Sequence, residues 1–202
     1  MIFTFKTAGE PQSVAILAGA FNPPTKAHVA LANAALDVVD EVLFAIPRAF
    51  PHKQFEGATL EQRIDMLNCI AESQAGISVA VAEGGLFAEI AREAQPHYRS
   101  ARIELLCGRD AAERILTWDY GDPEFVNRML QEFGLLIAPR SGHYEAPPKF
   151  RHAIRNLHLA NFDEFSSSNL RQRIAAGSDW RELAPEPIVE LIERIYKNNY
   201  PR

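Results

Sequence analysis

Residues 19–28 read Gly-Ala-Phe-Asn-Pro-Pro-Thr-Lys-Ala-His. The apolar run before this stretch, residues 13–18, predicts a buried strand. The Ala-rich run after it predicts a helix over residues 28–37. A strand, a tight Gly/Pro loop and a helix N-terminus therefore follow one another.

The start of this helix carries basic residues. Thr25 is the expected N-cap, which places Lys26 and His28 in the first helical turn. Acidic residues are preferred there, because the free N–H groups and the dipole of a helix make its N-terminus positive. A bound phosphate would supply the missing negative charge, so this stretch indicates an anion site.

The same alternation of strands and helices continues along the chain. Further strands are predicted over residues 41–46, 77–82, 102–107, 135–138 and 157–161. Further helices are predicted over residues 59–72, 86–94, 123–132, 168–175 and 187–196, with another directly after Gly108. Such alternation predicts the α/β class, with a Rossmann-like, doubly wound and mostly parallel sheet.

A single domain over residues 1–202 is expected. Residues 1–12 form an N-terminal extension without a clear pattern, and residues 163–202 form a C-terminal helical part. Ligands of such sheets bind at the carboxyl ends of the strands. The loops after the predicted strands, which carry Gly19, Lys53, Gly108 and Arg140, are therefore expected to converge.

Composition narrows the function classes. The chain has 202 residues, 47% of them hydrophobic, and a net charge of -5, which argues against a general nucleic-acid partner. Cys69 and Cys107 lie in apolar runs and are expected to be reduced core residues. No signal peptide, membrane-spanning run, P-loop or Gly-x-Gly-x-x-Gly motif is found, so a cytoplasmic protein without membrane contact is expected.

A second stretch of interest, residues 166–171, reads Ser-Ser-Ser-Asn-Leu-Arg. We expect Ser168 to cap a helix, which would put Arg171 at its third position. Hydroxyls, backbone N–H groups and an arginine would then meet at one place, as a polyphosphate requires. The alternative is an ordinary serine cap beside a solvated arginine.

Together the two stretches resemble the paired signature of the nucleotidylyltransferase superfamily. Its motifs are Gly-x-Phe-x-Pro-x-[His/Thr]-x-x-His and Ser-Ser-[Thr/Ser]-x-x-Arg, and they match here Gly19, Phe21, Pro23, Thr25, His28, Ser167, Ser168 and Arg171. Over most of its length the chain is similar to the nicotinate/nicotinamide mononucleotide adenylyltransferases. The segments that add to this resemblance are residues 51–53, Arg63 with Met66, 106–110 with Trp118, 136–144 and 183–187.

The resemblance implies transfer of an adenylyl group from ATP to a mononucleotide, with release of pyrophosphate, in NAD synthesis. It implies catalytic roles for Thr25, His28 and Arg171. It implies ATP-binding roles for Gly19, Ala20, Phe21, His28, Gly108, Asp110, Ser167, Ser168 and Arg171. Lys53, Trp118 and Arg140 are implied on the acceptor side. Mg²⁺ would be held mainly by the ATP phosphates, since no cluster with metal-ligand spacing occurs in the sequence.

Several of these residues also have ordinary structural explanations. Asp110 could simply cap a helix, Trp118 could belong to the core, and Lys53 could be solvated. Relatives in the bacterial branch carry Ser-Tyr-Thr-x-x-Thr after the third strand, a segment that contacts the mononucleotide. Here residues 83–90 read Glu-Gly-Gly-Leu-Phe-Ala-Glu-Ile, without those hydroxyls.

This departure leaves the acceptor open. One alternative keeps the chemistry but uses phosphopantetheine or a sugar or alcohol phosphate as acceptor. Another is a non-catalytic nucleotide-binding protein with the same fold. The oligomeric state, including a homo-oligomer, also stays open.

Overall fold

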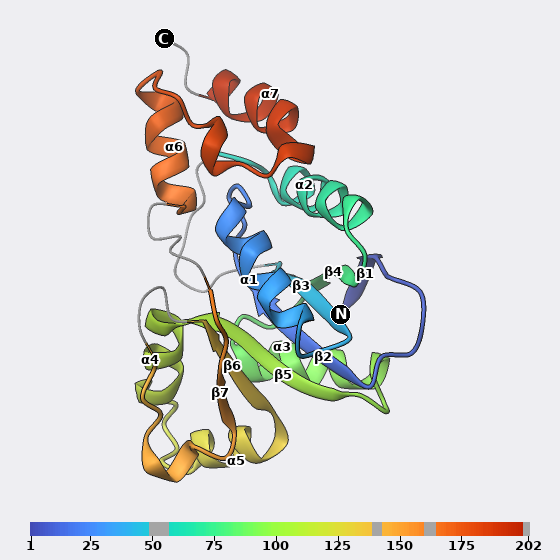
Figure 1. Ribbon diagram of the computed structural model, residues 1–202, viewed down its shortest axis with the longest axis vertical. Coiled ribbons are helices and arrows are strands. Elements are labelled where there is room, and N and C mark those ends of the chain that lie inside the picture. The colour runs from blue at the N-terminus through green and yellow to red at the C-terminus, as the bar shows by residue number, and fades with distance from the viewer. Residues whose placement is uncertain (49–56, 139–142, 160–164, 200–202) are drawn as a thin grey trace.

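A seven-stranded sheet forms the centre of the computed structural model (Figure 1), which describes residues 1–48, 57–138, 143–159 and 165–199. The strand order is β1-β4-β3-β2-β5-β6-β7. Neighbouring strands pair in parallel except β1, which runs antiparallel to β4. The strands are β1 (Ile2–Phe5), β2 (Ser13–Ala18), β3 (Glu41–Pro47), β4 (Ile77–Ala82), β5 (Arg102–Gly108), β6 (Gly134–Ala138) and β7 (Ile154–Asn156).

Helices cover both faces of the sheet. They are α1 (Lys26–Leu36), α2 (Leu60–Ser73), α3 (Phe87–Ala94), α4 (Arg109–Thr117), α5 (Phe125–Glu132), α6 (Ser167–Ala175) and α7 (Val189–Asn199). Short 3₁₀ turns cover Gln95–His97, Pro148–Phe150, Arg181–Leu183 and Glu186–Ile188. The predicted doubly wound α/β fold is confirmed.

Successive residues of the central strands point to opposite faces, and each face has its own core. Phe44 of β3 packs in the cluster shared with α1, α2, α6 and α7, whereas its neighbour Leu43 packs in the cluster shared with α3, α4 and α5. Because β3 and β4 are buried along their whole length, they read as continuous apolar runs. This explains why the central strands could be predicted from sequence.

Two strands differ from the prediction. The strand expected over residues 157–161 is wrong: the last strand is β7, Ile154–Asn156, residues 157–159 are irregular, and residues 160–161 lie outside the described residues. The sequence pattern does not predict β7 because two of its three residues, Arg155 and Asn156, are polar. The charge of Arg155 is matched by the buried carboxylate of Glu104, on another strand. Residues 1–12, expected to be patternless, contain the edge strand β1, whose side chains are only partly buried.

The parallel strands bring their carboxyl ends to one edge of the sheet. Ala18 ends β2 and Gly108 ends β5, and these two neighbouring strands lead into helices on opposite faces, α1 and α4. This is the switch point at which sheets of this kind open a crevice. Figure 1 shows α2, α6 and α7 gathered beyond the start of α1, at the top of the view.

Among the described residues, no helix has both the length and the apolar character needed to cross a membrane.

Asp40 links the neighbouring strands β2 and β3 at their amino ends. Its Oδ2 accepts hydrogen bonds from Gln12 N at 2.8 Å, Ser13 N at 2.9 Å and Ser13 Oγ at 3.0 Å. These donors stabilise the carboxylate and hold the pKa of Asp40 below its ordinary value of 3.8. The native state therefore gains stability from Asp40 at neutral pH, and loses it as the pH falls through the folded pKa.

We predict that Asp40→Asn lowers the urea midpoint at pH 7, and that its difference from the unsubstituted protein shrinks as the pH is lowered below about 3.8. Urea denaturation at pH 7 and pH 3 measures this. Asp37→Asn is the control, because it removes the same charge at the end of α1, outside this cluster of donors. A difference that stays constant with pH would contradict the assignment.

Candidate active site

A cavity of about 370 Å³ opens at the carboxyl edge of the sheet, between β2 and β5. It receives residues from five parts of the chain that lie far apart in the sequence. From the described residues, the lining consists of Leu17, Ala18, Ala27, His28, Leu31, Phe87, Leu106, Cys107, Gly108, Ala111, Ala138, Leu159, Phe165, Ser166, Ser167 and Ser168. No aspartate or glutamate belongs to this lining.

The start of α1 forms one side of the cavity. Thr25 is the N-cap, as predicted, and it is fully buried. Its Oγ1 donates a hydrogen bond to the Phe165 carbonyl at 2.9 Å. Its backbone N–H donates to His28 Nδ1 at 3.0 Å, so His28 takes the place that Glu or Gln holds in an ordinary capping box.

This contact determines how His28 can act. Nδ1 accepts from the Thr25 N–H at 3.0 Å, and Thr25 Oγ1 lies 2.9 Å from the same nitrogen, so two groups of Thr25 hold the ring. From the N–H hydrogen bond we assign the tautomer with the proton on Nε2. Lys26, the other basic residue of the first turn, is exposed.

Phe21 supports the ring of His28. The two ring centroids lie 5.2 Å apart in an edge-on arrangement, and Phe21 also packs on Phe44 at 5.4 Å. Phe21 is buried and has a φ of 48°, a left-handed conformation that is strained for a residue with a large side chain. A Cβ at Gly19 would lie 3.2 Å from the Phe21 ring, so Gly19 makes room for it.

The start of α6 forms the opposite side. The predicted cap at Ser168 is wrong: Ser166 is the N-cap, and its Oγ accepts from Asn169 N at 3.1 Å. Ser167 Oγ instead donates to the Pro23 carbonyl at 2.7 Å. Since the helix begins at Ser167, Arg171 lies in the second turn, not at the third position. Its Nη1 donates to the Asn22 carbonyl.

The two motifs are thus joined directly. Three hydrogen bonds connect residues 22–25 with residues 165–171. Ala27 and His28, just after the first segment, line the cavity together with residues 165–168 of the second. The N-terminus of α4, capped by Gly108, reaches the cavity as well. Residues at the starts of three helices therefore line one cavity, and the positive dipole end of a helix start suits a polyanion.

Comparison with known proteins agrees with this geometry. The family model described as cytidylyltransferase-like matches residues 16–173, which covers most of the chain and both motifs. The chain belongs to the cytidylyltransferase-like family. It is a nucleotidylyltransferase.

Two curated relatives and one solved structure extend this assignment. A "Probable nicotinate-nucleotide adenylyltransferase" of Bordetella avium is 30% identical, covering 89% of this chain and 94% of the relative. A protein with the same description from Gloeobacter violaceus is 27% identical, covering 91% and 94%. A structure of Plasmodium falciparum nicotinic acid mononucleotide adenylyltransferase complexed with NaAD has a TM-score of 0.70 at 18% identity, covering 94% of this chain and 98% of that one, and supports the fold.

Other predicted residues of this cytidylyltransferase-like protein lie around the cavity or away from it. The Ala20 carbonyl oxygen accepts a hydrogen bond from Arg63 Nη1 at 2.9 Å, and Ala20 is not among the described residues that line the cavity. Asp110 lies exposed in the first turn of α4. Lys53 and Arg140 lie outside the described residues.

Trp118 lies farthest from the cavity. It follows the last residue of α4, a helix of 9 residues that spans about 13 Å, whereas Gly108 precedes the first residue. Its side chain is 56% exposed and lines a separate cavity of about 440 Å³ with Tyr120 and Phe150. The structure does not bring Trp118 together with His28, and stacking on an acceptor stays a prediction.

The sequence analysis missed several lining residues. Phe165 lies directly before the serine motif and Ser166 is its first residue, so both could have been found from its position, whereas Phe87 and Leu159 carry no local signal. Cys107 also lines the cavity. Burial raises the pKa of its thiol to about 12, so it stays neutral and is not a nucleophile. Both cysteines are free, as expected.

The segment that departs from the bacterial pattern lies at the start of α3. The N–H groups of Gly85 and Leu86 both donate to Glu89 Oε2 at 3.0 Å. The N–H groups of Glu83 and Gly84 donate to the Glu93 carboxylate at 3.0 and 2.6 Å. The backbone N–H groups of residues 83–86 therefore bind carboxylates of the same chain, in the segment that departs from the bacterial hydroxyl pattern.

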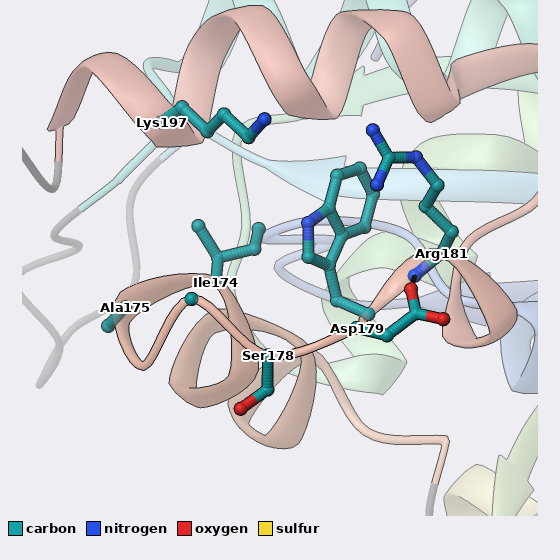
Figure 2. Close-up of a pocket in the computed structure, with 8 residues that line it drawn as sticks. Ile174, Ala175, Ser178, Asp179, Arg181 and Lys197 are labelled. Atoms are coloured by element: carbon teal, nitrogen blue, oxygen red, sulfur yellow. Dashed lines mark hydrogen bonds between the residues drawn. The ribbon is translucent and has the colours of Figure 1, made fainter.

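A larger cavity, of about 570 Å³, lies between α6 and α7 (Figure 2). Arg181 and Lys197 extend over it from opposite sides in this view. Both are paired with Glu193, which lies between them in sequence. None of the predicted site residues within the described part of the chain lines this cavity, so the smaller cavity at the sheet edge is the candidate active site.

We predict that Thr25→Val lowers the free energy of unfolding by about 1 kcal/mol, because the Phe165 carbonyl loses its donor. It should also weaken ATP binding, since the starts of α1 and α6 are no longer joined at this point. Thr59→Val is the matched control: Thr59 caps α2 and accepts from Gln62 N, so a similar loss of about 1 kcal/mol is expected without an effect on ATP. Chemical denaturation and ATP titration measure the two effects, and equal ATP affinity in both variants would contradict the prediction.

Proposed function

We propose that the protein transfers the adenylyl group of ATP to the phosphate of nicotinate or nicotinamide mononucleotide, with release of pyrophosphate, and so contributes to NAD synthesis. The observation that carries the proposal is the convergence of the α1, α4 and α6 N-termini, with His28, on one cavity. The names of the curated relatives support the choice of acceptor.

The reaction needs little acid–base chemistry. A phosphate oxygen of the mononucleotide attacks the α-phosphorus of ATP, and the bond between that phosphorus and the oxygen bridging to the β-phosphate breaks. The attacking group is already an anion, so no strong base is required. The protein contributes alignment of the two anions and stabilisation of the charge that develops on the phosphoryl oxygens.

His28 is proposed to donate from Nε2 to the α-phosphoryl oxygens. The capping contact supports this, because it fixes both the orientation of the ring and the nitrogen that carries the proton. Thr25 would act beside it by holding the helix start. Ser167, Ser168 and Arg171 would bind the phosphates that leave as pyrophosphate, from the N-terminal turns of α6.

Mg²⁺ is proposed to enter as part of the ATP complex. The described lining contains no carboxylate, and the described residues hold no group of three or more His, Cys, Asp or Glu suited to a metal ion. Phosphate oxygens and water are the ligands that Mg²⁺ usually keeps at such sites. The ion is therefore treated as part of the substrate, and its charge adds to that of the helix N-termini.

The choice of acceptor separates two candidate functions. The predicted acceptor residues stay Trp118, Lys53 and Arg140. The backbone N–H groups of residues 83–86 already donate to Glu89 and Glu93, which favours a second candidate function with the same chemistry and a different phosphate acceptor. An acceptor screen distinguishes the two. The purified protein is given ATP, Mg²⁺ and each mononucleotide, phosphopantetheine or sugar phosphate, and pyrophosphate release is measured.

We expect pyrophosphate release with a pyridine mononucleotide, and a fall in kcat of about 10²- to 10³-fold in both His28→Gln and His28→Ala, because both lose the phosphoryl donor. Gln at the third helical position keeps the capping acceptor, so only His28→Ala should also lose about 1 kcal/mol of stability. Steady-state kinetics and thermal denaturation separate these effects. Unchanged turnover in both variants would rule out the proposed role of His28, and silence with every acceptor would rule out the function.

Gly108 offers a second test, because the protein itself has room for a side chain there. A Cβ at Gly108 would meet only the Ala138 carbonyl oxygen, at 3.9 Å, yet it would border the cavity. We predict that Gly108→Ala raises the KM for ATP about tenfold and costs less than about 1 kcal/mol of stability. Gly19→Ala, whose Cβ would press on Phe21 at 3.2 Å, should instead lose stability. An unchanged KM in Gly108→Ala would place the nucleotide elsewhere.

A further inference from the structure

We propose that Tyr196, in the C-terminal helix α7, is a positioning residue that holds the loop before α1 in its catalytic conformation by way of Asn22. This inference rests on the proposed function of the cavity. Tyr196 does not line the cavity, and it follows Asn22 by 174 residues. Its effect must therefore pass through the residues that it contacts.

The contact itself is buried. Tyr196 has no exposed surface, Asn22 is 4% exposed, and the phenol hydroxyl donates to Asn22 Oδ1. The same oxygen accepts from Ala58 N at 3.3 Å. Asn22 is thus fixed between the segment that leads into α2 and the C-terminal helix. A buried amide oxygen that loses one of these donors is costly, because water cannot replace it.

Asn22 in turn touches the phosphate-binding parts of the site. Its backbone carbonyl accepts from Arg171 Nη1. The residue before it, Phe21, packs on the ring of His28, and the residue after it, Pro23, accepts from Ser167. A shift of Asn22 therefore changes the surroundings of three residues that are proposed to bind phosphate groups.

The Tyr196 ring packs tightly against Gly57, in the segment that leads into α2. Gly57 has a φ of +109°, and a Cβ there would lie 2.9 Å from Tyr196 Cε1 and 3.1 Å from Asn22 Oδ1. Arg63 of α2 also contacts the loop, because its Nη1 donates to the Ala20 carbonyl at 2.9 Å. The loop is thus held by Arg63 at Ala20 and by Tyr196 at Asn22.

The loop needs such restraint because its conformation is unfavourable by itself. Phe21 has a left-handed backbone that only surrounding contacts can maintain. Catalysis by alignment is sensitive to small displacements, and a shift of about 1 Å can cost about 10²-fold in rate. Loss of the Tyr196 hydroxyl should therefore reduce the chemical step more than substrate binding.

Tyr196→Phe tests this, since it removes the hydroxyl and keeps the ring. We expect kcat to fall at least about tenfold, while the KM values for ATP and the mononucleotide change less than about threefold. Tyr98→Phe is the matched control. Tyr98 is also buried and donates to a buried acceptor, Glu41, at the amino end of β3. It should lose stability to a similar or greater degree and keep its kcat.

A spectroscopic readout makes the test independent of turnover. The ¹⁵N and ¹H signals of the His28 ring should shift in Tyr196→Phe and stay unchanged in Tyr98→Phe. If the unsubstituted protein proves inactive with every acceptor while these signals shift, the proposed function fails and the positioning role stands. If Tyr196→Phe keeps both its kcat and its His28 signals, Tyr196 is only structural and the inference is overturned.

Should Tyr196→Phe fail to fold, Asn22→Ala removes the other partner of the same hydrogen bond and is measured in the same way. When both single variants fold, the double variant gives a further criterion. If the two residues act through one another, its kcat equals that of Asn22→Ala alone, because the effects are not additive. Fully additive effects on kcat would overturn the proposed route through Asn22.

Discussion

The hydrogen bond between Thr25 Oγ1 and the Phe165 carbonyl is the constraint on which the site depends. It joins the first helix of the fold to the segment that leads into α6. The bonds from Ser167 to Pro23 and from Arg171 to Asn22 reinforce it. Without this junction the sheet could still form, because its two cores are made by other residues. The cavity, however, would lose the wall that α6 supplies. Contacts between backbone carbonyls and side chains thus add to the hydrophobic cluster that α1 and α6 share, and join the starts of the two helices.

The helix starts around the carboxyl edge of the sheet differ in whether a carboxylate of the chain lies beside their backbone N–H groups. The segment before α3 is satisfied internally, because Glu89 and Glu93 accept from its backbone. The starts of α1, α4 and α6 border a cavity whose described lining has no carboxylate. At α1 the capping acceptor is the imidazole of His28, which adds no negative charge. The starts of these three helices therefore meet at one cavity, and the triphosphate proposed to bind there has the charge to match their positive ends.

Much of this arrangement could be predicted from the sequence. Central strands such as β3 and β4 are apolar except for Glu41 and Ser78, and the cap Thr25 is a local feature, so these were predicted correctly. What failed depends on distant partners. Among three consecutive serines, the choice of Ser166 as the cap is accompanied by a bond from Ser167 to Pro23, which no local rule reveals. The sequence also presents His28 as a cation, whereas its partner in space makes it an acceptor. Arg155 concealed β7 because its charge is matched by Glu104 on another strand.

The strand order explains how acceptor choice can vary while the phosphate chemistry is kept. His28 and Gly108 follow β2 and β5, which are neighbours, whereas the altered segment 83–86 follows β4, two strands from β2. At about 4.8 Å per strand, this separation is roughly 10 Å. The start of α3 still reaches the rim of the cavity through Phe87. Substitutions in this segment can therefore reshape the rim without touching the hydrogen bonds that join α1 to α6. The residues proposed to act on ATP and the segment proposed to affect acceptor choice follow different strands. A chain can therefore lose the hydroxyl pattern of its relatives and still keep Thr25, His28 and Arg171 in their places.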